Sequence, residues 1–411
     1  MFCVTWKESE VVDPSSQTSL ALLLRTALAM KRSRHILFSL LALNHDDTAI
    51  STSRTDPFVC RSNATHIVWK VDSTSPQLQG YQQNQNVKTR RTFAGETTLS
   101  DCTILTRKEA EKVCMSFLKD NIMSFDKPFM ETLGFPLDDA VDSDGLSHGL
   151  VEPTVSLALD AKVLYEWTDN LPQHIFLNYV LNYANLNEAR TNWRPLIADA
   201  LKFDESDLYK NSLNKSSTVM EEGELNITSV TTWVNEHLWT RLARREDEPI
   251  YFKSSQTPLI FDPMSTISFG YASCTGISIL FCNALRAVGV PARVAGTPAW
   301  NGNRENGNHN WVEVFVPRNA NGIGGEWKFL EPSPAMKQVD TLDNNPCDRW
   351  FCDPTRFPSS EVFAATLSRA EASTVHFPLA WEWGCHDVPG VNRTEYYAKV
   401  CGSCGSINKE T

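Results

Sequence analysis

The sequence lacks three features that would each point to a large class of proteins. It contains neither a G-x-G-x-x-G fingerprint nor a phosphate-binding loop, so no nucleotide cofactor is implied. It has no unbroken apolar stretch of about 20 residues, the length that a membrane-spanning helix needs. Apart from the short run 31–35, basic residues do not gather into a patch, and the formal net charge is -11 at pH 7, which argues against nucleic-acid binding.

Length and composition fit a soluble enzyme with additional segments. The chain has 411 residues, 42% of them hydrophobic, and can bury a sizeable core in two or three units. The stretch 46–104, rich in polar residues, is expected to be a disordered linker. A capping box at Thr106 and apolar spacing predict a helical region over 105–250. Residues 251–411 form the unit that holds the motifs described below, with a C-terminal extension.

Residues 1–45 have the features of a targeting segment. From Met30, the basic run 31–35 is followed by the short apolar run 36–43, which is typical of a secretory signal. The first 29 residues are then an upstream extension. A single membrane anchor over 20–43 is the alternative, but Arg25 and the basic run interrupt it. We therefore expect a secreted or lumenal protein, without stable membrane insertion beyond this possible signal.

Cysteines and glycosylation sequons favour the same compartment. Of 11 cysteines, setting aside Cys3, Cys274 and Cys282 leaves an even set that is expected to be partly or wholly disulfide-bonded. That set is Cys60, Cys102, Cys114, Cys347, Cys352, Cys385, Cys401 and Cys404. Four Asn-x-Ser/Thr triplets are candidate glycosylation sites, at Asn63, Asn214, Asn226 and Asn392. A zinc site would need two closely spaced cysteine pairs, and only the last two cysteines of the set have C-x-x-C spacing, so no metal site is predicted.

One cysteine occupies a position where a thiol becomes reactive. Cys274 precedes apolar residues at helical spacing, and Gly289 and Pro291 close the segment, so the sequence predicts a helix that begins at this cysteine. Unpaired N–H groups and the positive end of the dipole at a helix N-terminus favour the nucleophilic thiolate. A buried structural cysteine is the alternative that this segment alone leaves open.

A histidine and a carboxylate follow on two predicted strands. Residues 309–316 alternate as a half-buried strand would, beginning at His309, and a second short strand over 326–332 contains Glu331. A helix-borne thiol can meet a base and a carboxylate that lie on adjacent strands of a sheet packed against the helix. The sequence therefore gives Cys274, His309 and Glu331 as the candidate catalytic set.

These three residue types supply the roles that cysteine-based acyl transfer needs. The thiolate attacks a carbonyl carbon, the imidazole takes the thiol proton and delivers it to the leaving amine, and the carboxylate holds the ring in the required tautomer. Each residue alone has an ordinary structural explanation, since a histidine at a strand end or a glutamate before proline is usually not catalytic. Their order along the chain carries the argument.

The sequence resembles the transglutaminase-like superfamily of papain-like Cys-His-Asp/Glu enzymes. Four segments carry the resemblance in the expected order, at 273–278, 289–293, 307–314 and 327–332. It looks closest to a branch common in bacterial genomes and scattered in algae, which shares further segments at 176–185, 187–188, 193–194, 350–351, 376–378 and 388–392. The resemblance covers roughly residues 105–401. Most of the superfamily has Asp as the third catalytic residue, where this chain has Glu331.

The resemblance implies a fold, a reaction and a substrate class. The fold is α+β and papain-like, with the nucleophile helix packed on an antiparallel β-sheet after a helical N-terminal region. The reaction is acyl transfer or hydrolysis at an amide through a thioester, on a protein or peptide glutamine or a similar amide. No cofactor is implied, and a calcium requirement stays open. A cysteine peptidase, a peptide N-glycanase-type amidase and an inactive binding module are the alternatives.

The sequence defines only part of the oxyanion hole. The backbone N–H of Cys274 should be one of its donors, because it lies at the predicted helix N-terminus. For the second donor we consider Asn185, Asn187 and Trp193, which belong to the upstream segments shared with the branch.

Overall fold

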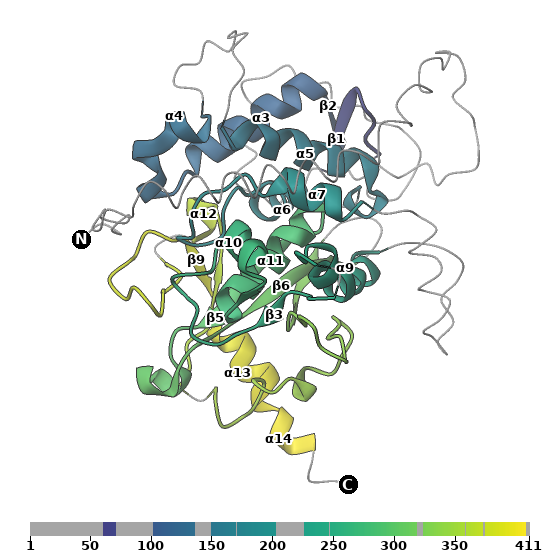
Figure 1. Ribbon diagram of the computed structural model, residues 1–411. Helices are drawn as coiled ribbons and strands as arrows, with labels where there is room; N and C mark the ends of the chain where they lie inside the picture. The colour runs from purple at the N-terminus through teal and green to yellow at the C-terminus, as the bar shows by residue number, and fades with distance from the viewer. Residues whose placement is uncertain are drawn as a thin grey trace. The chain divides into compact units, whose positions relative to one another are not determined.

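A five-stranded antiparallel sheet with one helix packed on its face forms the centre of the fold. In the computed structural model the strand order is β7-β6-β5-β8-β9. The strands are β5 (Ala292–Thr297), β6 (His309–Pro317), β7 (Gly325–Leu330), β8 (Phe363–Ala365) and β9 (Gly390–Asn392). Helix α11 (Cys274–Ala287) lies beside β5 and β6 (Figure 1). The predicted α+β class, with an antiparallel sheet and a nucleophile-bearing helix, is confirmed.

The structure describes residues 61–70, 102–135, 149–169, 171–202, 226–245, 247–318, 324–357, 359–372 and 375–407. The predicted targeting segment 1–45, most of the predicted linker and the sequon at Asn214 lie outside these residues.

The sequence of α11 accounts for its central place. Every residue of this helix after Cys274 is buried, because apolar side chains cover most of its circumference and the polar ones are small or hydrogen-bonded. The helix packs on the sheet with one side and on α7, α9 and α10 with the others. All residues of β5 are buried as well, which explains why its side chains do not alternate between apolar and exposed polar ones. Its one charged residue, Arg293, forms a buried ion pair with Glu313 of β6 at 2.7 Å.

Helices that precede α11 in the sequence cover it. Thr106 caps α3 with the predicted capping box to Glu109, and α9 begins at a second box between Asn226 and Ser229. The α-helices of this region are α3 (Arg107–Asp120), α4 (Met130–Leu133), α5 (Val151–Leu164), α6 (Gln173–Tyr179), α7 (Arg194–Ala200), α9 (Ile227–Arg241) and α10 (Pro263–Phe269). The short 3-10 helices are Ser124–Phe129 and Glu166–Thr168 here, and Trp300–Gly302, Arg304–Asn306 and Pro346–Asp348 further on.

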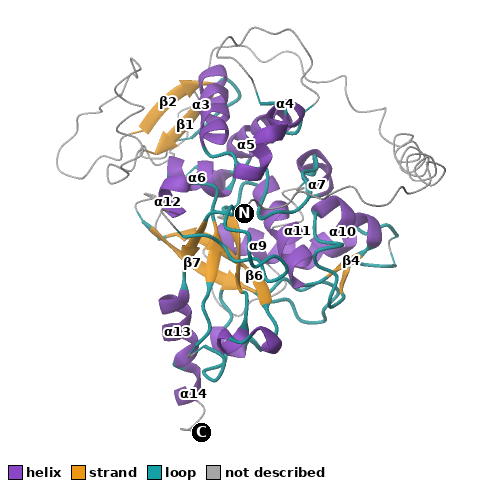
Figure 2. Ribbon diagram, turned by 90° about the vertical axis from the view of Figure 1, so that its left-hand side faces the viewer, coloured by secondary structure: helices purple, strands orange, loops and turns teal. Residues whose placement is uncertain are grey.

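The C-terminal extension covers the other face of the sheet. Its helices are α12 (Arg369–Ala372), α13 (Thr394–Gly402) and α14 (Cys404–Ile407), and Figure 2 shows the last two leading away from the strands. A second hydrophobic cluster joins Trp311 and Phe329 of the sheet to Phe351, Phe357 and Tyr397 of the extension. The sheet is thus buried on both faces, which fixes the side-chain positions on β6.

The predicted linker is wrong in part. Strand β1 (His66–Lys70) pairs antiparallel with β2 (Cys102–Thr106), and Ile67 and Trp69 are fully buried in the main core. A five-residue strand inside a long polar stretch gives too few apolar positions to reveal its periodicity. A second two-stranded sheet joins β3 (Tyr251–Phe252) to β4 (Tyr271–Ala272) in parallel, just before the nucleophile helix.

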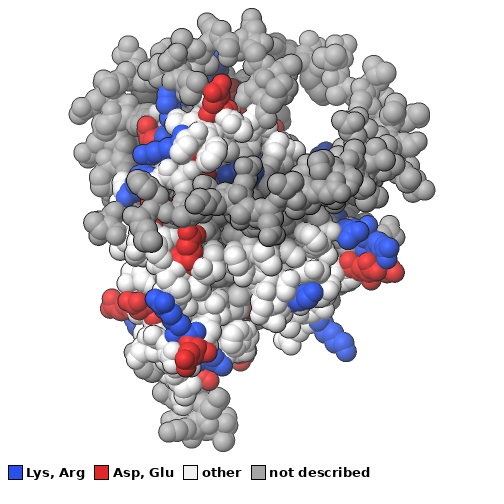
Figure 3. Space-filling view, turned by 60° about the vertical axis from the view of Figure 1, so that its left-hand side comes forward, with Lys and Arg blue, Asp and Glu red and all other residues white. Residues whose placement is uncertain are grey.

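Charged side chains are dispersed over the described surface that Figure 3 shows. On the face shown in Figure 3, Lys and Arg side chains lie in small groups mixed with Asp and Glu, and no patch of one sign forms there. None of the helices in the described part of the chain has the length and hydrophobicity needed to cross a bilayer.

Candidate active site

The nucleophile candidate lies at the start of α11, as the sequence predicts. Ser273 is the N-cap residue and Cys274 is the first residue of the helix. Thr275 Oγ1 donates to Asn310 Oδ1 at 2.9 Å, and Ser278 Oγ donates to the Asn310 carbonyl at 3.1 Å. These bonds tie the first turn of the helix to the first residues of β6, so the thiol faces the beginning of that strand.

The close approach of the Asn310 side chain to Thr275 depends on a glycine. Gly296 of β5 pairs with Asn310, and a Cβ atom added there would collide with the Asn310 side chain and the His309 carbonyl. The absence of a side chain at 296 therefore leaves Asn310 free to reach Thr275.

The three candidate catalytic residues meet in one hydrogen-bonded array. His309 is the first residue of β6 and is 5% exposed; its Nε2 lies 3.0 Å from Oε2 of Glu331, which directly follows β7. The ring is also hydrogen-bonded to the Cys274 thiol. Because Nε2 faces the carboxylate, Nδ1 is the nitrogen left for the thiol. The half-buried Cys274 is a free thiol, as the catalytic assignment requires.

The array favours the charged form of both partners. Burial raises the pKa of the Cys274 thiol, but the hydrogen bond to His309, its positive charge and the Asn310 backbone N–H together leave that pKa below the ordinary value. Burial lowers the pKa of His309, yet the Glu331 carboxylate and the Cys274 thiolate outweigh it and raise this pKa to about 10. The interactions therefore shift the pair toward a thiolate beside an imidazolium.

These shifts predict a bell-shaped pH dependence of turnover. The thiolate forms as pH rises through the lowered pKa of Cys274, and the imidazolium is lost as pH rises through about 10, the raised pKa of His309. Alkylation of Cys274 by iodoacetamide should accordingly reach its full rate at a lower pH than the alkylation of an ordinary cysteine. A rate that climbs tenfold per pH unit up to about 8.5, as for an ordinary cysteine, would contradict the ion pair.

The backbone of Glu331 is held from both sides. Its N–H donates to Asp340 Oδ2 at 2.7 Å, and its carbonyl accepts from Asn235 Nδ2 of α9 at 3.2 Å. The same oxygen of Asp340 accepts from Arg349 Nε at 2.6 Å. Asp340 thus positions Glu331 through the main chain, while Asp343 forms an exposed ion pair with Lys328 at 3.6 Å.

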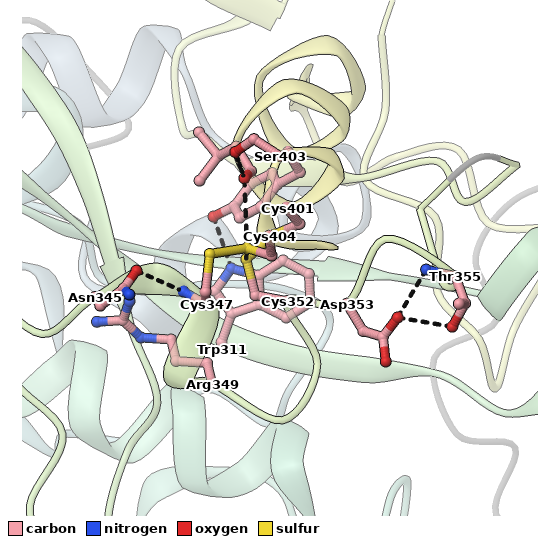
Figure 4. The surroundings of a disulfide bond; sticks show 12 residues. Trp311, Asn345, Cys347, Arg349, Cys352, Asp353, Thr355, Cys401, Ser403 and Cys404 are labelled. Atoms are coloured by element: carbon pink, nitrogen blue, oxygen red, sulfur yellow. Dashed lines mark hydrogen bonds between the residues drawn. A yellow bond between two sulfur atoms is a disulfide. The ribbon is translucent and has the colours of Figure 1, made fainter. Parts of the chain in front are cut away.

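Aromatic rings enclose the histidine. The Trp350 and Phe351 ring centroids lie 4.7 and 5.2 Å from that of His309. Two disulfides flank these rings in sequence and join their loop to α13 and α14: Cys347 with Cys404, and Cys352 with Cys401 (Figure 4). From α13, the Tyr397 hydroxyl accepts from the Trp311 indole N–H at 2.7 Å. The extension therefore holds Trp350 and Phe351 in contact with the His309 ring.

The prediction that this set is partly or wholly disulfide-bonded is confirmed for these four cysteines, and Cys385 is disulfide-bonded as well, whereas Cys114 is not. Cys114 is a free thiol, fully buried in α3, where its apolar surroundings raise its pKa and make it a core residue. The two disulfides are consistent with a secreted or extracellular protein.

Removing one of these disulfides is expected to lower stability markedly. A Cys352→Ser/Cys401→Ser variant lacks the cross-link between two residues that are 49 positions apart in the sequence. Its free energy of unfolding should be lower by about 2–5 kcal/mol. Urea unfolding checks this, with Cys114→Ser as a control for the loss of a buried thiol. Non-reducing peptide mapping should recover both pairings, and alkylation of all four cysteines before reduction would contradict them.

A cavity of about 810 Å³ opens above the array. All three candidate catalytic residues line it, together with hydroxyl residues from 254–257 and apolar side chains from several loops. Its size is that of a site for a small molecule or a few residues of a peptide.

The three proposed oxyanion residues do not line this cavity. Asn185 Nδ2 donates to Asn283 inside α11 at 2.8 Å, Asn187 Nδ2 to Glu382 at 2.8 Å, and Trp193 Nε1 to the Tyr183 carbonyl at 3.3 Å. The prediction for these residues is therefore wrong. Their segment packs against α11 away from the cavity, as the bond from Asn185 to Asn283 shows. The Cys274 backbone N–H remains the expected donor, since the first N–H groups of a helix have no partner within it.

The described sequon asparagines are all exposed. Asn63 lies in a turn where its side chain accepts from the His66 N–H, Asn392 ends β9 and accepts from the Thr394 N–H, and Asn226 caps α9. Their accessibility permits glycosylation, which stays a prediction.

Sequence reasoning missed the residues that surround His309 and Glu331. Asn310 follows the histidine directly, yet nothing in the pattern indicates that its side chain reaches the nucleophile helix. The cysteines around Trp350 and Phe351 were the available signal, because pairing them with Cys401 and Cys404 would have brought this loop onto the sheet.

A comparison with protein-family models agrees with this geometry. Residues 215–332 match the model of the transglutaminase-like superfamily, a narrower range than the resemblance seen in the sequence, and one that contains all three candidate catalytic residues. No curated protein sequence matches the chain. A crystal structure described as a putative cysteine protease from Cytophaga hutchinsonii aligns at 15% identity over 45% of this chain and 57% of that one, with a TM-score of 0.20.

The chain therefore contains a core of the transglutaminase-like superfamily. Together with the array of thiol, imidazole and carboxylate, this core defines a cysteine-dependent enzyme in general terms.

Proposed function

We propose that the protein transfers an acyl group from a carboxamide, through a thioester on Cys274, to an amine or to water. One observation carries the proposal: a thiol at a helix N-terminus is hydrogen-bonded to an imidazole that a carboxylate holds, at the floor of an open cavity. The acyl donor is a glutamine side chain of a protein or peptide, or a similar amide.

The reaction needs only groups that the chain supplies. The Cys274 thiolate attacks the carboxamide carbon, and the negative charge that develops on oxygen is stabilised by the Cys274 N–H. The C–N bond then breaks, and His309 gives its proton to the departing ammonia. An amine or water then attacks the thioester, and His309 takes up the proton that this nucleophile loses. The C–S bond breaks, which restores the Cys274 thiolate and yields an amide from an amine or a carboxylate from water. Glu331 orients the ring throughout.

The proposed setting is the secretory pathway. The two disulfides support it, and exposed Asn63, Asn226 and Asn392 offer positions for glycan. In that setting the mature chain begins shortly after Leu43, and the substrate is an extracellular or lumenal protein or peptide.

Mass spectrometry of a glutamine peptide, incubated with the purified protein in the presence and absence of a primary amine, tests the reaction. Formation of the amine adduct, or of glutamate without amine, supports the proposal. Cleavage of the peptide backbone would assign a cysteine peptidase instead, and release of an asparagine-linked glycan would assign an amidase of the N-glycanase type. Complete inertness toward all these substrates would favour a binding module. Parallel reactions with and without a calcium chelator decide whether calcium is required.

A further inference from the structure

The described residues that form the walls of the cavity carry no fixed charge outside the catalytic array. Among the described residues that line it, the only ionisable side chains are those of Cys274, His309 and Glu331. These three are already paired with one another. No lysine, arginine or aspartate of the lining is therefore available to bind a free α-carboxylate, an α-ammonium group or another charged group of a substrate.

The mouth of the cavity is instead apolar. Phe252 of β3, Met336 and Trp350 come from three separate segments, and all three line the cavity while remaining 53%, 61% and 54% exposed. Large apolar side chains that remain exposed around a cavity gain free energy when a ligand covers them, and such groups mark interaction sites. Trp350 also contacts the His309 ring, so the apolar mouth extends to the reacting groups.

Neutral hydrogen-bonding groups complete the lining. Ser254, Ser255 and Thr257 follow β3 and line one side, and Asn308 lies beside the histidine. Hydroxyl and amide side chains can both donate and accept, which suits the N–H and C=O groups of a peptide main chain. The wall thus combines partners for a peptide backbone with surfaces for apolar side chains.

We propose that the acyl donor is an internal segment of a polypeptide in which apolar residues flank the reacting carboxamide. This inference rests on the proposed function and narrows its substrate class. The uncharged wall disfavours a free chain terminus or an acidic or basic neighbour near the reacting group, because a desolvated charge would find no partner there. Apolar neighbours, in contrast, bury Phe252 and Met336.

Alkylation of Cys274 tests the apolar mouth without any turnover. Iodoacetamide and N-benzyl iodoacetamide are compared, with each rate divided by the rate of the same reagent on glutathione. The benzyl reagent should be favoured at least about tenfold, the scale expected when a ring leaves water for an apolar wall. This preference should disappear in Phe252→Ala and Met336→Ala and persist in Leu164→Ala, a control at an exposed apolar residue of α5 outside the cavity.

Peptides test the same inference in the reaction. With blocked termini, an internal glutamine between leucine and phenylalanine should exceed one between lysine and aspartate by at least about tenfold in kcat/KM, for the same physical reason. A glutamine at a free terminus should be the poorest donor. Equal rates, or faster reaction of charged or terminal donors, would overturn the inference.

The alkylation and peptide experiments together distinguish a failure of this inference from a failure of the proposed function. Fast labelling of Cys274 without a benzyl preference, or with one that survives in both Phe252→Ala and Met336→Ala, refutes the apolar mouth alone. If the benzyl preference behaves as expected but no carboxamide reacts, the apolar mouth is supported and the acyl-transfer reaction is refuted. If Cys274 is labelled no faster than the buried Cys282 by either reagent, both proposals fall.

Discussion

Replacing Cys274 with alanine is expected to abolish turnover, by about 10⁶-fold if the loss matches that of other catalytic nucleophiles. The variant should stay folded, because the side chain is half-buried at the start of α11 and does not belong to the main core cluster. The measurement is the rate of amide turnover, together with iodoacetamide labelling mapped by mass spectrometry. In the parent protein, label should appear on Cys274 first.

The matched control is Cys282→Ala in the same helix. Cys282 is fully buried, and burial raises its pKa to about 11, so its thiolate is scarce at neutral pH. The control should keep its activity and its label on Cys274. Full activity in Cys274→Ala, or equal labelling of the two thiols near neutral pH, would remove Cys274 from the mechanism.

A Glu331→Gln substitution is expected to lower kcat by about 10²- to 10⁴-fold while leaving the fold intact, the scale seen when a triad loses its orienting carboxylate. Glutamine keeps the shape and the backbone bonds to Asp340 and Asn235, but it removes the negative charge that raises the pKa of His309. The alkaline limb of the pH profile should therefore move to lower pH, a change that a purely structural role would not produce.

Glu326→Gln provides the control on the same strand, since this glutamate is exposed and lies outside the cavity. It should match the parent in rate and in pH profile. A Glu331→Gln rate within about twofold of the parent would instead mean that another group orients the histidine. Asp340 would then be tested next, because its carboxylate already lies beside the Glu331 backbone.

The sequence predicted the parts of the site that depend on local pattern. The start of α11 and the strand that begins at His309 follow from short-range periodicity and capping, and the structure places them as expected. The next strand forms as predicted but ends at Leu330, so Glu331 directly follows it instead of lying within it. Periodicity is informative for such elements because each buries one consistent face.

The rest depends on contacts between distant segments. The roles of Asn185 and Trp193 could not be read from their neighbours, since the packing of 180–194 behind α11 is decided by buried hydrogen bonds such as the one to Asn283. The loop with Trp350 lies on His309 because its flanking disulfides reach α13 and α14, and spacing alone does not fix disulfide connectivity. Strand β1 was hidden by its short length.

The central claim is that Cys274 carries the acyl group, and the most direct measurement is the mass of the intact protein after rapid quenching with a glutamine peptide. The account predicts an adduct equal to the peptide less ammonia, located on Cys274, cleaved by hydroxylamine and absent in Cys274→Ala. Turnover of the peptide without such an adduct, or with the adduct on another residue, would contradict the thioester mechanism.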